Sequence, residues 1–236
     1  MTQAYFVTGT DTGVGKTLVS AALMHLLAAH QKKVVGMKPV ASGCRKTARG
    51  LRNDDAEMLI AASTVKAEYK DVNPYAFEPA IAPHLAAQEA GVKIELQTIL
   101  DHFERLQQTA DTVVVEGIGG WMVPLGRIIT GEHLAKTLGL PVILVVGVRL
   151  GCLNHALLTA RAIEAAGLRL SGWVANLIDP TMERVNDNLH TLEKRLTVPF
   201  LGTVPWQQTP DYRHAAIHLS LPEAFACGND CHSTYQ

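Results

Sequence analysis

The 236-residue sequence predicts a doubly wound α/β fold, in which a mainly parallel sheet carries helices on both faces. Short apolar runs rich in β-branched residues alternate with longer segments of helical period. The run 141–146 is apolar at every position, which is typical of a central strand covered on both sides. The 21 Lys and Arg nearly balance the 22 Asp and Glu, so no bulk positive charge indicates a nucleic-acid partner.

Individual elements follow from these patterns. The expected strands are residues 4–8, 33–37, 112–116, 141–147, 172–176 and 198–202. Apolar residues with helical spacing begin at Val19, Leu96, Leu153 and Val185, and Gly167 is placed to end the third of these helices. Residues 41–91 are less regular and are broken by three prolines, so this insertion is expected to form a wall of the substrate site.

The size and the termini favour a single-domain intracellular protein. We expect one domain over residues 1–225 and a loose polar tail over 226–236. Four cysteines are too few for a disulfide scaffold, and residues 1–4 do not begin a secretory signal. The longest apolar stretch, 140–148, is about half of a membrane span. We therefore expect a cytoplasmic protein without a membrane partner.

A glycine-rich loop follows the first predicted strand and opens the first helix. Residues 9–17 read Gly-Thr-Asp-Thr-Gly-Val-Gly-Lys-Thr, in which glycines let several backbone N–H groups face an anion. Lys16 can reach the β and γ phosphates and the Thr17 hydroxyl can ligate Mg²⁺. Thr10 stands where the usual pattern has glycine, so Gly9 is expected to supply the turn one residue earlier. The loop predicts a P-loop NTPase-like fold with a nucleoside triphosphate site; the alternative is a glycine-rich turn without a ligand.

Carboxylates that could hold the magnesium ion occur at two later places in the chain. Glu116 closes the apolar run 112–116, at the end of the sheet where α/β proteins bind ligands. The alternative is an ordinary glutamate at the end of a strand. Asp54 and Asp55 lie near the end of the second strand-and-helix unit. By themselves they could equally be magnesium ligands or the N-cap of a helix.

Taken together, these motifs resemble the dethiobiotin synthetase family of biotin synthesis. The matching segments are 5–17, 38–43, 50–55, 73–75, 115–121, 145–155, 172–176 and 202–206. The most specific are Lys-Pro-Val-Ala-Ser-Gly at 38–43 and Leu-Gly-Cys-Leu-Asn-His at 150–155.

The resemblance implies an ATP-dependent ligase that forms C–N bonds. Its substrate is 7,8-diaminopelargonate, one amine of which captures CO₂ as a carbamate. The carbamate oxygen attacks the γ-phosphorus of MgATP to give a carbamic-phosphoric anhydride. The second amine then closes a cyclic urea, with release of ADP and phosphate. A carbamate needs this activation because its anionic oxygen leaves badly.

Roles for individual residues also follow from the resemblance. Lys38, Lys16 and Thr12 are the implied catalytic residues. Thr17, Asp55 (rather than Asp54) and Glu116 are implied to hold Mg²⁺. The implied ATP-binding residues are Gly13, Val14, Gly15, Lys16, Thr17, Leu18, Asp55, Glu116, Gly117, Ile118, Gly119, Asn176, Pro205, Trp206 and Gln207, with Asn176 at the adenine edge.

The implied substrate site spans two subunits. Thr12, Lys38 and Ser42 contact the substrate within one subunit. In the family the carboxylate tail is held by the partner subunit, and the matching residues here are Gly151, Cys152, Leu153 and Asn154. The resemblance therefore implies a homodimer. Asn188 stands where some relatives carry a tyrosine near this tail.

Two other functions are less consistent with the sequence. A nucleotide switch of the partitioning ATPase type carries lysine where this loop has Asp11 and glycine where it has Thr12. A glutamine-dependent amidoligase needs an additional glutaminase domain, for which the 236 residues leave no room.

Overall fold

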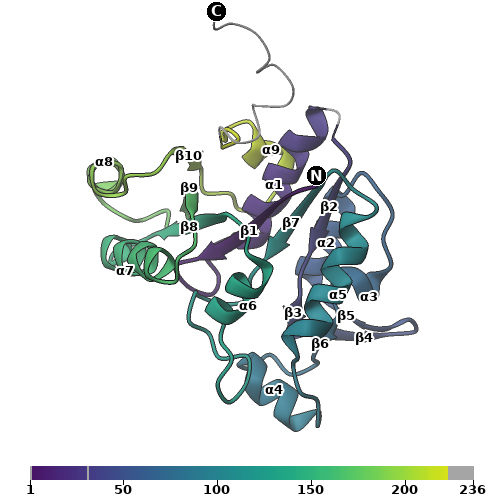
Figure 1. Ribbon diagram of the computed structural model, residues 1–236. Coiled ribbons are helices and arrows are strands. Elements are labelled where there is room, and N and C mark those ends of the chain that lie inside the picture. Colours follow the sequence, from purple (N-terminus) through teal and green to yellow (C-terminus); the bar gives the residue numbers. More distant parts are fainter. Residues whose placement is uncertain (1, 31, 223–236) are drawn as a thin grey trace, which may run out of the picture.

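The computed structural model describes residues 2–30 and 32–222 (Figure 1). Its strands are β1 (Gln3–Gly9), β2 (Val34–Met37), β3 (Val40–Ala41), β4 (Arg45–Thr47), β5 (Gly50–Arg52), β6 (Tyr75–Ala76), β7 (Thr112–Glu116), β8 (Val142–Val148), β9 (Leu170–Leu177) and β10 (Phe200–Val204). Its helices are α1 (Lys16–Ala29), α2 (Asp54–Ala62), α3 (Tyr69–Val72), α4 (Pro83–Glu89), α5 (Leu96–Gln107), α6 (Gly131–Leu138), α7 (Cys152–Ala165), α8 (Val185–Arg195) and α9 (Tyr212–Ala216).

The predicted parallel sheet is confirmed. A six-stranded sheet has the order β10-β9-β8-β1-β7-β2, and every neighbouring pair of its strands is parallel. These are the six predicted strands, with boundaries that differ by at most two residues. Because the strands are parallel, their carboxyl ends lie along one edge of the sheet, and the segments that follow them meet there.

Helices cover both faces of the sheet, as predicted (Figure 1). Successive residues of a strand point to opposite faces, so Tyr5 and Val7 of β1 pack with α1 while Ala4 and Phe6 join a second cluster. The first cluster also contains buried residues of α2 and α9. The second contains buried residues of α5, α6 and α7. Two apolar layers therefore enclose a sheet whose central strands are buried on both sides.

The four predicted helices correspond to α1, α5, α7 and α8. Helix α7 ends at Ala165, and Gly167 follows with a φ of +77°, which explains the stop that the sequence predicts. The short helices α2, α3, α4, α6 and α9 were not predicted, because an element of one to three turns shows too little apolar periodicity. The β4–β5 hairpin, an antiparallel pair within the irregular segment, was missed too.

One alternative from the sequence is wrong. Neither Asp54 nor Asp55 is the N-cap of α2, because the side chain of Asn53 occupies that position and accepts a hydrogen bond from the Ala56 N–H at 3.3 Å. The two aspartates instead lie in the first turn of the helix, where the positive end of the helix dipole stabilises negative charge.

Within residues 2–30 and 32–222, no helix is long and apolar enough to cross a membrane. The predicted tail at 226–236 and the domain boundary at residue 225 lie outside the described residues and remain predictions.

Candidate active site

A cavity of about 540 Å³ opens at the carboxyl edge of the sheet. The phosphate loop borders it between β1 and α1, and the segment after β2 contributes Lys38. Lining residues are Thr12, Gly13, Lys16, Lys38, Ala41, Ser42, Asn53, Asp55, Ala80, Ile81, Ala82, Pro83, Ile118, Gly119 and Val123. The cavity thus brings together the three predicted catalytic residues with Gly13, Asp55, Ile118 and Gly119, and residues of the irregular segment 41–91 form one wall of it. The other predicted ATP-binding residues, Thr17 and Glu116 among them, do not line it.

Close packing explains the glycines of the phosphate loop. Gly13 and Gly15 have φ angles of +73° and +88°, in the region that favours glycine. A Cβ on Gly15 would lie 2.1 Å from Asn176 Nδ2, so a side chain is excluded there. Gly9 does not supply a turn, which corrects the sequence-based expectation. It is the last residue of β1, and it is needed because a Cβ would approach Val14 Cγ2 to 2.6 Å.

Lys16 is a buried cation with few neutralising partners. Its Nζ donates a hydrogen bond to the Asp11 carbonyl at 2.9 Å, and no carboxylate among the described residues lies within ion-pair distance. Burial, followed by repulsion from Lys38, lowers the pKa of Lys16 to about 8. An anion bound in the loop would restore the charge balance of this lysine, as a nucleotide phosphate does.

Lys38 is buried and fully compensated. Its Nζ lies 2.6 Å from Glu116 Oε1 and 2.9 Å from Asp55 Oδ2. Burial alone lowers the pKa of Lys38, but the two carboxylates outweigh it and raise the pKa above its ordinary value. For Asp55, burial acts to raise the pKa, and the Lys38 ammonium reverses this and holds it below its ordinary value. For Glu116, burial is the largest effect and raises the pKa above its ordinary value, although the Lys38 ammonium acts to lower it. Lys38 and Asp55 therefore carry their charges at neutral pH.

The oxygen atoms beside Lys38 fit a magnesium ion. The Thr17 hydroxyl donates to Glu116 Oε1 at 2.9 Å, and Asp55 reaches the same cluster. Glu116 Oε2 is buried and has no hydrogen-bond partner among the described residues. A hard divalent cation prefers such oxygens, and Mg²⁺ characteristically takes one or two carboxylates and completes its shell with phosphates and water. Within the described residues, no group of three or more His, Cys, Asp or Glu could hold a metal ion.

An ion pair fixes the first half of the loop. Asp11 Oδ2 lies 2.6 Å from Arg149 Nη2, just after β8, and Asp11 Oδ1 accepts the Thr12 N–H at 2.7 Å. The hydrogen bond from Thr12 and the charge of Arg149 lower the pKa of Asp11. Thr12 itself is exposed and lines the same cavity as Lys38.

The residues expected at the adenine base lie at the ends of β9 and β10. Asn176 is buried, and its Nδ2 donates to the Val14 carbonyl at 2.9 Å, so its amide holds the phosphate loop in this structure. Gln207 Oε1 accepts the Asp211 N–H at 2.6 Å, while its buried Nε2 lacks a partner among the described residues. Trp206 is 47% exposed. None of these side chains lines the cavity, so the predicted base contacts remain predictions.

The two parts of the predicted substrate site are separate within one chain. Ser42 lines the cavity, and its buried Oγ has no partner among the described residues. Residues 151–154 begin α7 and do not line the cavity. Gly151 is the N-cap with a φ of +95°, and no side chain caps the first turn. The Asn188 side chain bonds the start of its own helix α8, since its Nδ2 donates to the Arg184 carbonyl at 2.9 Å.

Other lining residues had no assigned role in the sequence analysis. Asn53, the run Ala80–Pro83 and Val123 also line the cavity. In the sequence, Ala82-Pro83 indicates only a break in the chain. In the structure, Pro83 is the first residue of α4, and the residues just before it line the cavity. In the sequence, the Ala82-Pro83 pair was the available signal that a new helix begins at this point.

The fold and the site define a P-loop NTPase-like nucleotide-binding protein. A family model described as an AAA domain matches residues 3–211. The septum site-determining protein MinD of Pyrococcus horikoshii OT3, solved with Mg-ADP, has a similar fold (TM-score 0.57, 15% identity, 92% of this chain and 86% of that chain). A chain of the MinC:MinD cell division complex of Aquifex aeolicus gives a TM-score of 0.55 at 19% identity, over 91% of this chain and 86% of that chain.

Sequence relatives narrow the class to one family. The ATP-dependent dethiobiotin synthetase BioD of Xanthomonas campestris pv. campestris (strain B100) is 51% identical over 220 residues, 93% of this chain and 98% of its own length. The BioD of Pseudomonas paraeruginosa (strain DSM 24068 / PA7) is 52% identical over 219 residues, 92% of this chain and 96% of its own length. The chain belongs to the ATP-dependent dethiobiotin synthetase family.

Proposed function

We propose that this chain catalyses the ATP-dependent closure of 7,8-diaminopelargonate and CO₂ to dethiobiotin. Family membership supports this reaction, and so does the form of the site. The observation that carries the proposal is the convergence of the phosphate loop, Lys16 and Lys38 on one cavity next to two carboxylates. A reaction that brings a carbamate to a triphosphate must gather several anions, and this arrangement of cations does so.

Each residue has a chemical task in this scheme. The loop N–H groups and Lys16 hold the phosphates in line, while Lys38 draws the carbamate oxygen toward the γ-phosphorus. Thr12 lines the same cavity as Lys38 and can donate a hydrogen bond to the transferring phosphoryl group. Phosphoryl transfer depends on positioning and charge neutralisation, so no general base with a shifted pKa is required. The unpartnered Ser42 hydroxyl supplies a polar contact for the diamine.

Magnesium belongs to the proposed site. Thr17, Asp55 and Glu116 would hold it, and the unpartnered Glu116 Oε2 supports this assignment. A bound Mg²⁺ supplies neutralisation of charge on the phosphate oxygens. Without a metal ion, the Lys38 ammonium pairs with both carboxylates. A Mg²⁺ ion bound to the same carboxylates would take over part of their negative charge, and the ammonium could then turn toward an anionic substrate.

A homodimer completes the proposed substrate site. Residues 151–154 start α7 and lie outside the cavity of their own chain. The Cys152 N–H already donates to the Arg149 carbonyl at 3.0 Å, and no side chain caps the other N–H groups of the first turn. In a dimer they would meet the carboxylate tail of a substrate bound to the partner. Because the Asn188 side chain is bonded within α8, these N–H groups would carry tail recognition.

The competing nucleotide-switch function is not favoured. The likeness to MinD shows a shared fold alone, at 15% identity. The loop position where switches of this type carry lysine is Asp11, and that carboxylate is paired with Arg149 inside the same chain.

Omission and isotope experiments test the proposal. Purified protein is incubated with MgATP, bicarbonate and 7,8-diaminopelargonate, leaving out one component at a time, and the cyclic urea is identified by mass. With ¹⁸O-labelled CO₂, the attacking carbamate oxygen should remain with phosphorus when the ring closes, so the released phosphate carries one label. Phosphate release that ignores the diamine, or unlabelled phosphate during full turnover, would contradict the proposal.

A further inference from the structure

The Asn73-Pro74-Tyr75 motif matches the family, but it lies outside the cavity lining. Asn73 is only 3% exposed, and its side-chain amide is fully used. Nδ2 donates to the Lys38 carbonyl at 2.7 Å and to the Tyr75 carbonyl at 3.2 Å, while Oδ1 accepts the Tyr69 hydroxyl at 3.0 Å. The Lys38 N–H in turn donates to the Val72 carbonyl at 2.8 Å. Both backbone polar groups of Lys38 are therefore held by Val72 and Asn73.

The Tyr69 hydroxyl extends this network to the second partner of Lys38. Besides donating to Asn73, it accepts the Asn53 N–H at 2.8 Å. Asn53 caps α2, and Asp55 lies two residues further along in the first turn of that helix. One hydroxyl thus joins the backbone beneath Lys38 to the backbone that presents Asp55, whose side chains meet at 2.9 Å.

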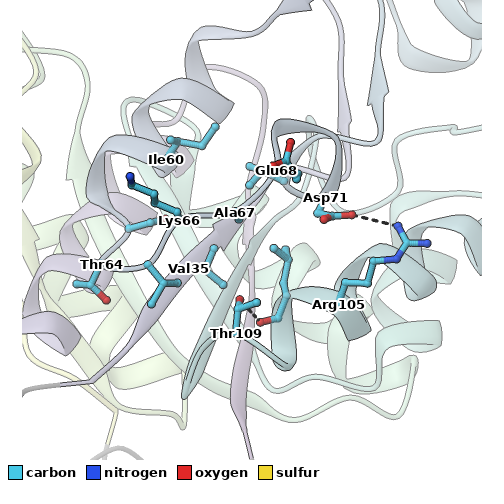
Figure 2. A pocket seen from close by; sticks show the side chains of 13 residues that line it. Val35, Ile60, Thr64, Lys66, Ala67, Glu68, Asp71, Arg105 and Thr109 are labelled. Carbon is cyan, nitrogen blue, oxygen red and sulfur yellow. Dashed lines mark hydrogen bonds and ion pairs between the residues drawn. The ribbon is translucent and has the colours of Figure 1, made fainter.

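The short helix α3, which contains Tyr69, is itself anchored to α5. Asp71 Oδ1 lies 2.6 Å from His102 Nδ1 and 3.1 Å from Arg105 Nη1. Figure 2 shows the Asp71–Arg105 pair beside a second cavity of about 550 Å³ between these helices, which none of the predicted site residues lines. The helix that carries Tyr69 is therefore tied to α5 by these ion pairs.

We propose that Asn73 and Tyr69 are positioning residues that set the place of the Lys38 ammonium relative to Asp55. This rests on the proposed function, since it assigns them to the same reaction. A lysine stem is long and flexible, so its ammonium is well placed only when its backbone is fixed. Outer hydrogen bonds that orient a reacting group typically affect activity about 10- to 100-fold.

The test is a pair of matched tyrosine variants. Tyr69→Phe removes the bridging hydroxyl but keeps the ring, over which the Arg52 guanidinium stacks at 3.9 Å. Tyr75→Phe is the control, because the Tyr75 hydroxyl likewise accepts one backbone N–H at a helix start, that of Glu95 at 3.0 Å, away from Lys38. We expect Tyr69→Phe to lower kcat about tenfold with KM for ATP changed less than twofold, and Tyr75→Phe to leave both unchanged.

A second measurement does not depend on turnover. Hydrogen exchange of the Lys38 backbone amide reports its bond to Val72, and we expect about tenfold faster exchange in Tyr69→Phe than in the wild type or in Tyr75→Phe. If the wild type makes no cyclic urea, the proposed function fails while this measurement still tests the network. Equal kcat in the two variants, or faster exchange without a change in kcat, would overturn the positioning role. Asn73→Ala removes more bonds, so it is used only if it melts within a few degrees of the wild type.

Discussion

The two lysines of the site belong to regions that achieve their charge balance differently. The phosphate loop at residues 9–17 places Lys16 through local backbone geometry, and its ammonium contacts only a carbonyl among the described residues. The segment after β2 places Lys38 through distant partners, Glu116 on β7 and Asp55 on α2. The loop thus holds a positive charge that has no carboxylate within ion-pair distance among the described residues, whereas Lys38 is paired with two carboxylates without any ligand.

This difference separates binding from positioning. A buried cation without a counter-charge costs folding free energy, and the bound phosphate recovers it as affinity. Removing a buried cation that pairs with two carboxylates should destabilise the fold, because it leaves their charges uncompensated. In the proposed reaction, this cation would exchange partners when substrate and metal bind. The following predictions test whether the two regions differ in this way.

The largest effect is expected for Lys16→Gln. Loss of the cation that holds the β and γ phosphates should reduce turnover by at least about 10³-fold. Because the variant removes a poorly compensated buried charge, its melting temperature without ligands should equal or exceed that of the wild type. Steady-state turnover and thermal melting measure the two quantities, and a clearly lower melting temperature would refute the account of Lys16.

Lys38→Gln should lower turnover about 10²-fold with little change in ATP affinity. Here the stability effect has the opposite sign. Removing the partner of buried Glu116 should cost about 3 kcal/mol, as is usual when one member of a buried ion pair is lost. Added Mg²⁺ should recover part of this loss, which denaturation with and without the ion measures.

Lys93→Gln is the matched control for both lysine variants, since Lys93 forms an exposed ion pair with Glu95. It should change neither turnover nor stability. If Lys38→Gln behaved in the same way, Lys38 would have no part in the reaction.

Within the phosphate loop, two glycine variants separate backbone strain from packing. Gly13→Ala and Gly15→Ala share the strain of a positive φ, but only at Gly15 would the new Cβ meet Asn176, at 2.1 Å. We expect Gly15→Ala to weaken ATP binding at least about tenfold more than Gly13→Ala, because the loop must move to admit it. Calorimetric titration with ATP measures the ratio, and equal affinities would show that Asn176 does not constrain the loop.

The smallest effect is a pH dependence confined to the phosphate loop. The pKa of Lys16 is lowered to about 8 in the folded protein, so its proton is lost as the pH rises through 8. The unfolded chain keeps this proton to about pH 10.5, and the penalty for burying the charge, complete below pH 8, disappears between these values.

Nucleotide binding needs the charged form, so affinity should be constant below pH 8 and fall by up to about tenfold per pH unit above it. Lys16→Arg, which stays charged, should flatten this profile. A wild-type affinity that did not change from pH 7.5 to 9.5 would contradict the assignment.

The main elements were predictable because their signals are local. Alternating apolar runs gave the six strands, and the Gly9 to Thr17 segment gave a phosphate loop, since both patterns arise from neighbours in the chain. Residues 41–91 were not resolved into elements, because short helices such as α2 and α4 are stabilised by tertiary contacts rather than by their own periodicity. The N-cap of α2, left open as one alternative for Asp54 and Asp55, is Asn53, whose backbone N–H donates to the distant Tyr69 hydroxyl.

The sequence by itself determined the fold class and the nucleotide loop, and it indicated Lys38, Asp55 and Glu116 as candidate site residues. Only the tertiary structure decided that Glu116 Oε1 is shared by Thr17 and Lys38, that Asn176 closes on Gly15, and that Asn73 supports the backbone of Lys38. These contacts join residues between 35 and 161 positions apart. Chain patterns encode periodicity and turns, whereas distances between side chains on different strands depend on how the whole sheet packs.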